Sequence, residues 1–403
     1  MHAPTLRFEE FTDGWLSKNL GEISRIASGG TPSRSNKSFW GGDIPWVTTA
    51  EIKFGLIKNS QEKITAVGLK NSSAKIFPKG TLLMAMYGQG KTRGQVAKLG
   101  IDASTNQACA AILLEKDVSQ DYVLQYLGNQ YENIRSLSND GGQKNLSSAL
   151  VKEIPIWLPS IEEQTKIANF LTAIDAKISQ LIKKHQLLSS YKTGVMQKIF
   201  SQELRFKDES GEYFPAWKIV RLSEIAEFFR GGQLAKSHLN INGENLCIHY
   251  GELFTVYAET ISTVKSRTNI SDGFIGYAGD IVMPSSDVTP DGLARASCLL
   301  IDRVILGGDM NIIRPIKTVD PAMLSYLLNF DKKKVIDLVS GTTVKHIYIK
   351  DIKGIELATP RSLNEQSAIS TFLIELDKKI QIVKLQIELS KKYKQGLLQQ
   401  MFV

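Results

Sequence analysis

Two stretches of the chain, residues 161–200 and 363–402, carry the same narrow stripe of apolar residues among Lys, Gln, Glu and Ser. The apolar positions alternate by three and four residues over several heptads, a spacing that is typical of a two-stranded coiled coil. Each stretch therefore predicts a helix roughly 55–60 Å long, and we expect the two helices to bury their stripes against each other. The predicted seam comprises Leu171, Ile174, Ile178, Leu181, Leu188, Val195, Leu373, Leu376, Ile380, Val383, Ile387 and Leu397.

The residues around the two stretches agree with this prediction. Pro159 and Pro360 come just before them, where the missing N–H of proline costs little. His185 falls on the first stripe, and we interpret it as a tolerated polar layer and not as a metal ligand. The pattern leaves one alternative open, in which two amphipathic helices lie on separate cores.

The chain is an internal duplication. Glu163-Gln164 recurs as Glu365-Gln366, 202 positions later (365 minus 163), and Trp15 recurs as Trp217 at the same offset. Other matching positions drift by a few residues, as small loop insertions and deletions would make them do. The sequence therefore predicts two units of about 200 residues, each a globular domain followed by a long helix.

The globular parts are predicted to mix strands and helices in an α/β (α+β) fold. Ser119–Ser136 and Asp320–Asp331 are expected to be helices capped by Ser119 and Asp320. The expected fold is a tandem duplication of two globular domains separated by a long antiparallel two-helix coiled coil. Apolar runs of strand length are Thr81–Tyr87, Ala108–Leu114, Ile154–Leu158, Ile281–Met283 and Ile312–Ile316. The expected boundaries are 1–158 for the first domain, 159–200 for the first helix, 201–216 for a polar linker, 217–360 for the second domain and 361–403 for the second helix.

Composition places few limits on function. The net charge of +8 permits an anionic partner without proving one. The three cysteines are scattered and form no C-x-x-C pair, which argues against a disulfide framework or a zinc site and favours a reducing cytoplasm. No apolar core of a signal peptide and no run long enough to span a membrane is present, so we expect a cytoplasmic protein without membrane contact.

The two globular halves diverge in particular segments while the framework around them persists. Residues 33–75 and 88–104 of the first half have almost no matches in residues 235–269 and 285–303 of the second. A shared scaffold with different loops is what two readers of different ligands would need, although drift without functional change would also alter loops. The candidate DNA-binding residues lie in these segments and in two loops that combine glycine with Lys and small polar residues: Arg34, Lys37, Lys70, Lys75, Lys91, Thr92, Arg93, Lys144, Asn145, Arg267, Arg295, Thr343, Lys345 and His346. The alternative interpretation of each residue is an ordinary surface charge in contact with water.

Motifs for catalysis are missing. The segment Tyr87–Thr92 resembles a phosphate loop only in part, because the pattern requires glycine at the position of Ala85. The five histidines show no ligand spacing, and neither G-x-S-x-G nor His-Glu-x-x-His occurs. The sequence contains no amino-methyltransferase motif and no nuclease motif. Duplication and long helices without catalytic residues indicate a binding scaffold with no metal site.

On these residues the chain resembles the specificity (S) subunits of Type I restriction-modification enzymes. The resemblance depends on the Trp-x4-Leu-x2-Ile openings at Trp15–Ile23 and Trp217–Ile225 with the Gly-Gly that follows each. It also depends on Leu158–Ala168, which reads Leu-Pro-Ser-Ile-Glu-Glu-Gln-Thr-Lys-Ile-Ala. The second copy has one extra residue between Pro360 and Glu365-Gln366, which is expected to shift the start of its helix.

The resemblance implies a sequence-specific DNA-binding subunit. Its two target-recognition domains would each read one half-site of a bipartite, asymmetric double-stranded DNA target, and the two helices would set the spacing. It also implies binding of two modification (M) subunits to the helices and of restriction (R) subunits through that core. S-adenosylmethionine, ATP and Mg would be bound by those partners, and this chain would have no cofactor and perform no catalysis of its own. Two other functions stay open on the sequence: a coiled-coil adaptor that binds only proteins, and an enzyme with an unrecognised site.

Overall fold

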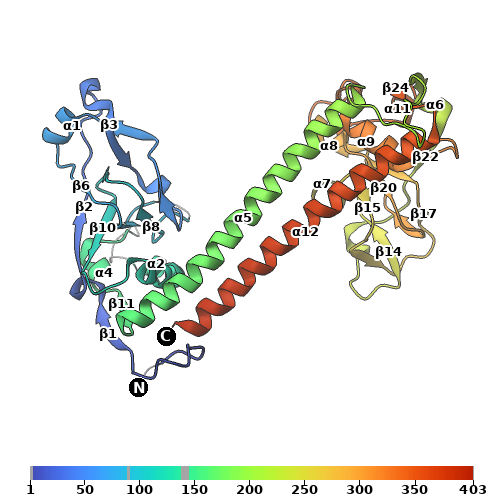
Figure 1. Cartoon of the computed structure of the whole chain (residues 1–403). Coiled ribbons are helices and arrows are strands. Elements are labelled where there is room, and N and C mark those ends of the chain that lie inside the picture. The colour runs from blue at the N-terminus through green and yellow to red at the C-terminus, as the bar shows by residue number, and fades with distance from the viewer. Residues whose placement is uncertain (1–2, 89–90, 138–144, 403) are drawn as a thin grey trace. The chain divides into compact units, whose positions relative to one another are not determined.

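The computed structural model describes residues 3–88, 91–137 and 145–402, and the chain divides into two compact units. Unit 1 comprises residues 1–182 and 385–403, and unit 2 comprises residues 183–384. Each unit therefore contains one globular domain, the first half of one long helix and the last half of the other (Figure 1). The division cuts through both helices, because each helix half packs with the domain beside it.

The long helices are α5 (Ile161–Phe200) and α12 (Leu363–Met401), close to the predicted ranges. In unit 1 the end of α12 meets the start of α5, where Lys394 Nζ lies 2.7 Å from the Asp175 carboxylate. In unit 2 the end of α5 meets the start of α12, where Lys192 Nζ lies 2.6 Å from Asp377. These two equivalent contacts run in opposite chain directions, so the helices are antiparallel. Every residue of the predicted seam is buried or half-buried.

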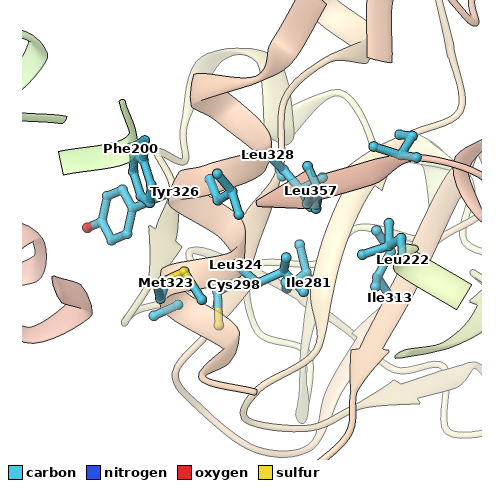
Figure 2. Close-up of a cluster of buried hydrophobic side chains, with 14 of the residues drawn as sticks. Phe200, Leu222, Ile281, Cys298, Ile313, Met323, Leu324, Tyr326, Leu328 and Leu357 are labelled. Carbon is cyan, nitrogen blue, oxygen red and sulfur yellow. The ribbon is translucent and has the colours of Figure 1, made fainter. Parts of the chain in front are cut away.

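The ends of the helix pair also contribute to the core of each unit. Leu171 and Leu397 belong to the main apolar cluster of unit 1, together with Tyr122 and Phe402. In unit 2, Phe200 from the end of α5 joins the equivalent cluster beside Tyr326, as Figure 2 shows. The seam is thus shared between helix–helix and helix–domain packing.

The domain of unit 1 contains two sheets of mixed direction and a short ribbon. The five-stranded sheet has the order β2-β10-β7-β8-β4, the four-stranded sheet has the order β5-β3-β9-β6, and β1 pairs with β11. Its elements are β1 (Leu16–Asn19), β2 (Ser24–Ser28), β3 (Trp40–Val47), β4 (Leu56–Ile57), β5 (Glu62–Ile64), α1 (Ala66–Lys70), β6 (Ile76–Phe77), β7 (Leu82–Ala85), β8 (Val96–Leu99), β9 (Ala103–Thr105), β10 (Cys109–Leu114), α2 (Gln120–Asn129), α3 (Tyr131–Ser136), α4 (Ser148–Lys152) and β11 (Pro155–Leu158), with 3-10 turns η1 (Leu20–Glu22), η2 (Lys37–Phe39) and η3 (Thr49–Glu51).

The domain of unit 2 repeats this plan and contains a two-stranded ribbon, β19–β23, whose equivalent in unit 1 lies partly outside the described residues. Its sheets have the orders β13-β22-β18-β20-β15 and β16-β14-β21-β17, and β12 pairs with β24. Its elements are β12 (Lys218–Arg221), α6 (Leu222–Ile225), β13 (Ala226–Arg230), η4 (Lys236–His238), β14 (Asn245–Ile248), α7 (Glu252–Thr255), β15 (Thr260–Ile261), β16 (Ser266–Thr268), β17 (Phe274–Gly276), β18 (Ile281–Pro284), β19 (Ser286–Asp287), α8 (Pro290–Leu293), β20 (Ser297–Leu299), β21 (Val304–Leu306), β22 (Met310–Pro315), α9 (Pro321–Phe330), α10 (Lys332–Ile336), β23 (Lys345–His346), α11 (Ile349–Ile352) and β24 (Glu356–Thr359).

One predicted helix is wrong in its extent. Residues 119–136 form two helices, α2 and α3, because Gln130 leaves helical geometry at φ −82° and ψ 7°. Gly128 and Asn129, which precede the break, are both weak helix formers. The caps are as predicted: the Ser119 hydroxyl accepts a hydrogen bond from Tyr122 N, and the Asp320 carboxylate accepts one from Met323 N. The predicted strands coincide with β7, β10, β11, β18 and β22, with ends shifted by up to two residues.

Candidate nucleic-acid interface

The repeated Glu-Gln pair fastens each domain to the start of its helix. The Glu163 carboxylate accepts hydrogen bonds from Arg7, at 2.7 and 2.8 Å, and from Trp15 Nε1 at 3.4 Å. In unit 2 the Glu365 carboxylate accepts from Arg205, at 3.1 and 3.4 Å, and from Trp217 Nε1 at 3.0 Å. Both carboxylates are buried, so each needs these donors. The glutamate recurs because it holds the first tryptophan of its domain.

The glutamine of the pair also fastens the domain to the start of the long helix. Gln164 accepts a hydrogen bond from Ser119 N at 3.0 Å and donates one to Pro159 O at 2.9 Å. Gln366 accepts from Asp320 N at 2.7 Å and donates to Pro360 O at 3.0 Å. One side chain thus joins the cap of a domain helix to the strand end before the long helix. The framework that carries the loops is therefore equally well anchored in both units.

In unit 2 two of the predicted loops lie together, and we call residues 285–296 and 339–347 loop pair 2. Ile347 N donates to Ser285 O at 3.1 Å, and β19 pairs with β23. Ser340 and His346 exchange two backbone hydrogen bonds of 3.0 and 2.8 Å, which closes the turn between them. Loop pair 2 includes the candidates Thr343, Lys345 and His346, and Arg295 lies at its edge.

The equivalent loop pair 1 of unit 1 comprises residues 86–95 and 138–146. Leu146 N donates to Met86 O at 3.0 Å, the counterpart of the bond in unit 2. Asn145 is half-buried, and Lys144 lies outside the described residues. The described ends of loop pair 1 therefore make the same backbone contact as loop pair 2, between segments about 60 residues apart in sequence.

The basic residues of loop pair 1 differ in how accessible their charged groups are to a ligand. Lys91 is exposed, and its carbonyl accepts a hydrogen bond from the Tyr131 hydroxyl at 2.5 Å. Thr92 is half-buried beside it. Arg93 donates through NH2 to Arg135 O at 2.8 Å, while its buried Nε has no hydrogen-bond partner within the described ranges. Lys91 is thus the cation of this loop with most access to a ligand.

The other candidates of unit 1 lie on a different part of the domain. Arg34 stacks on Trp40 at 3.8 Å and makes a bidentate pair with Glu62, at 2.5 and 2.9 Å. The hydrogen bonds to Glu62 raise the pKa of Arg34, and the same bonds lower the pKa of Glu62. Lys37 in η2 and Lys70 in α1 are exposed on neighbouring elements, because α1 packs on η2. Lys75 is exposed just before β6.

Two arginines of unit 2 are used inside the domain. Arg267 donates to Gly243 O at 3.1 Å, and Arg295 donates to the carbonyls of Leu253 and Phe254. These guanidinium groups fix loops through backbone oxygens, so only their remaining N–H groups are available to a ligand. These backbone partners could not be inferred from the sequence.

Sequence reasoning also missed a buried ion cluster in unit 2. Lys192 Nζ lies 2.8 Å from Glu259 and 2.6 Å from Asp377, and the Tyr326 hydroxyl donates to Asp377 at 2.5 Å. Burial raises the pKa of Asp377 although Lys192 opposes that shift, and burial likewise raises the pKa of Tyr326. In unit 2 the carbonyl of Glu259 accepts a hydrogen bond from Cys298 N. In unit 1 the carbonyl of Gly55 accepts the equivalent bond from Lys98 N, so Gly55 occupies the position of Glu259. The extra carboxylate is therefore a feature of unit 2.

The described residues contain no candidate metal site. No group of three His, Cys, Asp or Glu within them could hold a metal ion. No helix among them has the length and apolar character to cross a membrane. The three cysteines are buried free thiols. At the surface of unit 2 remains the described loop pair 2, and its sequence differs from that of loop pair 1.

Comparison with known proteins agrees with this arrangement. The model of the family described as Type I restriction modification DNA specificity domain matches residues 12–188 and again residues 216–390. The chain is 26% identical over 379 residues to the Type I restriction enzyme MjaIX specificity subunit of Methanocaldococcus jannaschii, which covers 86% of this chain and 83% of the relative. It is 28% identical over 176 residues to the EcoR124I/EcoR124II specificity subunit of Escherichia coli, covering 42% and 43%.

Two solved structures share the fold. The Type-I restriction-modification system S subunit from M. genitalium superposes with a TM-score of 0.66 at 15% identity, covering 100% of this chain and 99% of that one. A structure concerned with complex assembly and conformational transition of the type I R-M system gives a TM-score of 0.55 at 16% identity, covering 96% and 97%. At these identities the likeness concerns the fold.

Proposed function

Because the chain belongs to the Type I restriction modification DNA specificity domain family and is a specificity subunit for DNA target recognition, we propose that each globular domain reads one half-site of a bipartite target. The two half-sites differ, since the domains present different side chains. The stretch of DNA between them is not read. The chain itself performs no catalysis.

The observation that carries this proposal is the pair of loops at equivalent places on a duplicated framework. Loop pair 1 presents Lys91 and Arg93, whereas the corresponding loop of unit 2 contains Asp287, Val288 and Asp291. Cations suit phosphates and guanine edges, while carboxylates and aliphatic groups suit cytosine amino groups and thymine methyl groups. Equal scaffolds with unlike contact chemistry are what recognition of an asymmetric sequence requires.

We further propose that α5 and α12 set the spacing between the half-sites and bind two modification subunits. Exposed apolar residues recur on the helices at equivalent positions: Leu187 and Tyr191 on α5, and Leu389 and Tyr393 on α12. Their exposed fractions lie between 53% and 61%, which is unusual for such side chains on a helix with no partner. Two equivalent patches support two copies of one partner. Restriction subunits would join through that core.

The cofactors follow from this division of labour. S-adenosylmethionine, ATP and Mg would be bound by the modification and restriction subunits in the cytoplasm, and this chain would contribute specificity. Purified alone, it should transfer no methyl group to any duplex. Methyl transfer by the isolated chain would favour an enzyme with an unrecognised site, and absence of DNA protection by the assembled complex would favour a protein-only adaptor.

The experiment that tests the proposal measures binding of the assembled complex to its cognate duplex as a function of salt. Phosphate contacts release counterions, so the logarithm of the binding constant should fall linearly with the logarithm of salt concentration, with a slope of roughly −0.9 per phosphate contacted. A scrambled duplex should retain the slope and lose the affinity. A flat salt response, or equal affinity for both duplexes, would contradict the proposal.

A further inference from the structure

Loop pair 2 exposes two valines at one end of the β19–β23 ribbon. The strands pair antiparallel, with Ser286 opposite His346 and Asp287 opposite Lys345. Val288 directly follows Asp287 and Val344 directly precedes Lys345, so both valines lie at the same end of the ribbon. Val288 is 72% exposed and Val344 is 46% exposed. Transfer of these aliphatic side chains from water onto an apolar group of a ligand would be favourable.

The loop that carries Val344 is held in one conformation. The Ser340–His346 backbone pair closes it, and Lys345 Nζ donates to Gly341 O at 2.7 Å. Gly341 has φ +101°, and a Cβ there would lie 2.2 Å from Val344 O, so only glycine fits this turn. Val344 is therefore exposed on an ordered turn and not on a loose one.

The loop that carries Val288 uses its polar side chains internally. Thr289 Oγ1 donates to Asp287 Oδ2 at 2.7 Å and accepts from Gly292 N at 3.3 Å, which caps α8. Asp287 also lies over Gly292, where an added Cβ would approach Oδ2 to 1.8 Å. The carboxylate and the hydroxyl on either side of Val288 are thus already bonded within the loop. The exposed side chain between them, that of Val288, offers a ligand an apolar surface.

We propose that Val288 and Val344 form a methyl-reading tip that contacts the C5-methyl group of a thymine in the major groove. A two-stranded ribbon fits that groove, and the thymine methyl is the apolar group displayed there. The inference rests on the proposed function, because it takes unit 2 as the reader of one half-site. It adds the prediction that this half-site contains a thymine whose methyl group is recognised.

The test uses the full chain assembled with its modification subunits and a duplex carrying the target found by mapping methylated adenines. Each thymine of the duplex is replaced in turn by deoxyuridine, which removes the methyl group and leaves base pairing intact. We expect one replacement in the half-site read by unit 2 to weaken binding about fourfold, the factor expected for loss of one buried methyl group.

Matched variants assign that effect to the tip. Val288→Thr and Val344→Thr keep the side-chain shape but replace a methyl with a hydroxyl, so they should reduce or abolish the difference between thymine and deoxyuridine. Ile241→Thr is the control, since Ile241 is 89% exposed in the same domain but lies outside loop pair 2. It should retain the full difference.

Several results would overturn the inference. One is equal binding of the thymine and deoxyuridine duplexes by the wild-type complex. This measurement does not depend on how the variants fold. Another is a half-site for unit 2 without thymine on either strand. Val288→Thr and Val344→Thr complexes that keep the discrimination but lose modification subunits would show a protein contact instead. Failure of the wild-type complex to bind any mapped target would contradict the proposed function itself.

Discussion

At the scale of single residues, the two copies differ in how deeply equivalent charges are buried. Lys192 and Lys394 occupy the same place in the repeat. Lys192 has two partners, Glu259 and Asp377, whose side chains are 21% and 16% exposed, whereas the Asp175 partner of Lys394 is 42% exposed. Loss of Lys192 would leave two largely buried carboxylates in unit 2 without a positive charge beside them. Loss of Lys394 would leave one carboxylate in unit 1, and water can reach it.

Lys192→Met should therefore destabilise unit 2 by roughly 3–5 kcal/mol, the usual cost of breaking a buried ion pair from one side. The matched control, Lys394→Met, should cost about 1 kcal/mol or less in unit 1, because water can reach Asp175. Equal losses in the two variants would contradict this account of the cluster.

The cysteines allow each unit to be measured separately. Burial raises the pKa of Cys109 to about 12 and that of Cys247 to about 11, and it also raises the pKa of Cys298. The thiolate is the reactive form, so at pH 8 labelling of the native thiols should be slow and proceed through local opening. Lys192→Met should accelerate labelling of Cys247 and Cys298 about a hundredfold or more and leave Cys109 unchanged. Acceleration at Cys109 as well would mean that the whole chain is destabilised.

The basic residues of loop pair 1 give a further prediction at the scale of single residues. Lys91→Ala should weaken DNA binding by roughly 1–3 kcal/mol at a single base pair if the side chain reads a base, or uniformly across sequences if it contacts a phosphate. Arg93→Ala should also weaken binding, and part of its effect would come from the lost bond to Arg135 O. Lys177→Ala, an exposed lysine on α5, is the control. Unchanged binding in both loop variants would remove this loop from the interface.

At the scale of elements, the parts that could be predicted are those whose signal is local. The heptad pattern gave α5 and α12 nearly to the residue, and Ser119 and Asp320 marked helix starts because a cap acts within one turn. Strands of two or three residues such as β4, β15 and β19 carry too few positions for any periodicity to show. Gln130 ended a helix that the pattern extended to Ser136.

The candidate site was predictable only in outline. Glycine and lysine placed the loops, but their pairing depends on backbone bonds such as Leu146 to Met86 and Ile347 to Ser285, which join distant segments. The same limit applies to Arg267 and Arg295, whose carbonyl partners are set by the folded domain. Nor could the exposed positions of Val288 and Val344 be distinguished in sequence from those of core valines.

The helix pair gives a prediction about spacing. Deletion of one heptad from each helix, residues 179–185 and the equivalent 381–387, keeps the seam in register and shortens each helix by about 10 Å. The spacer between half-sites should then shorten by roughly three base pairs, since ten base pairs span about 34 Å. Insertion of an extra heptad at the same points should lengthen it. Mapped methylation sites with an unchanged spacer in both variants would mean that the helices do not set the distance.

At the scale of the whole molecule, duplication explains why one chain can recognise an asymmetric target. Each unit contains a domain fastened to its helix by the same Glu-Gln pair and the same tryptophan. The parts that differ are the loop pairs and the ion cluster around Lys192. A framework repeated so closely allows either domain to change its loops without disturbing the other.

The most direct test of this account maps methylated adenines in cells that carry the complex, with this chain intact and with its residues 217–360 replaced by the equivalent domain of another specificity subunit. The account predicts two short half-sites separated by an unread spacer of fixed length, and the exchange should alter one half-site while the other half-site remains the same. A single contiguous target, or an exchange that changes both half-sites together, would contradict it.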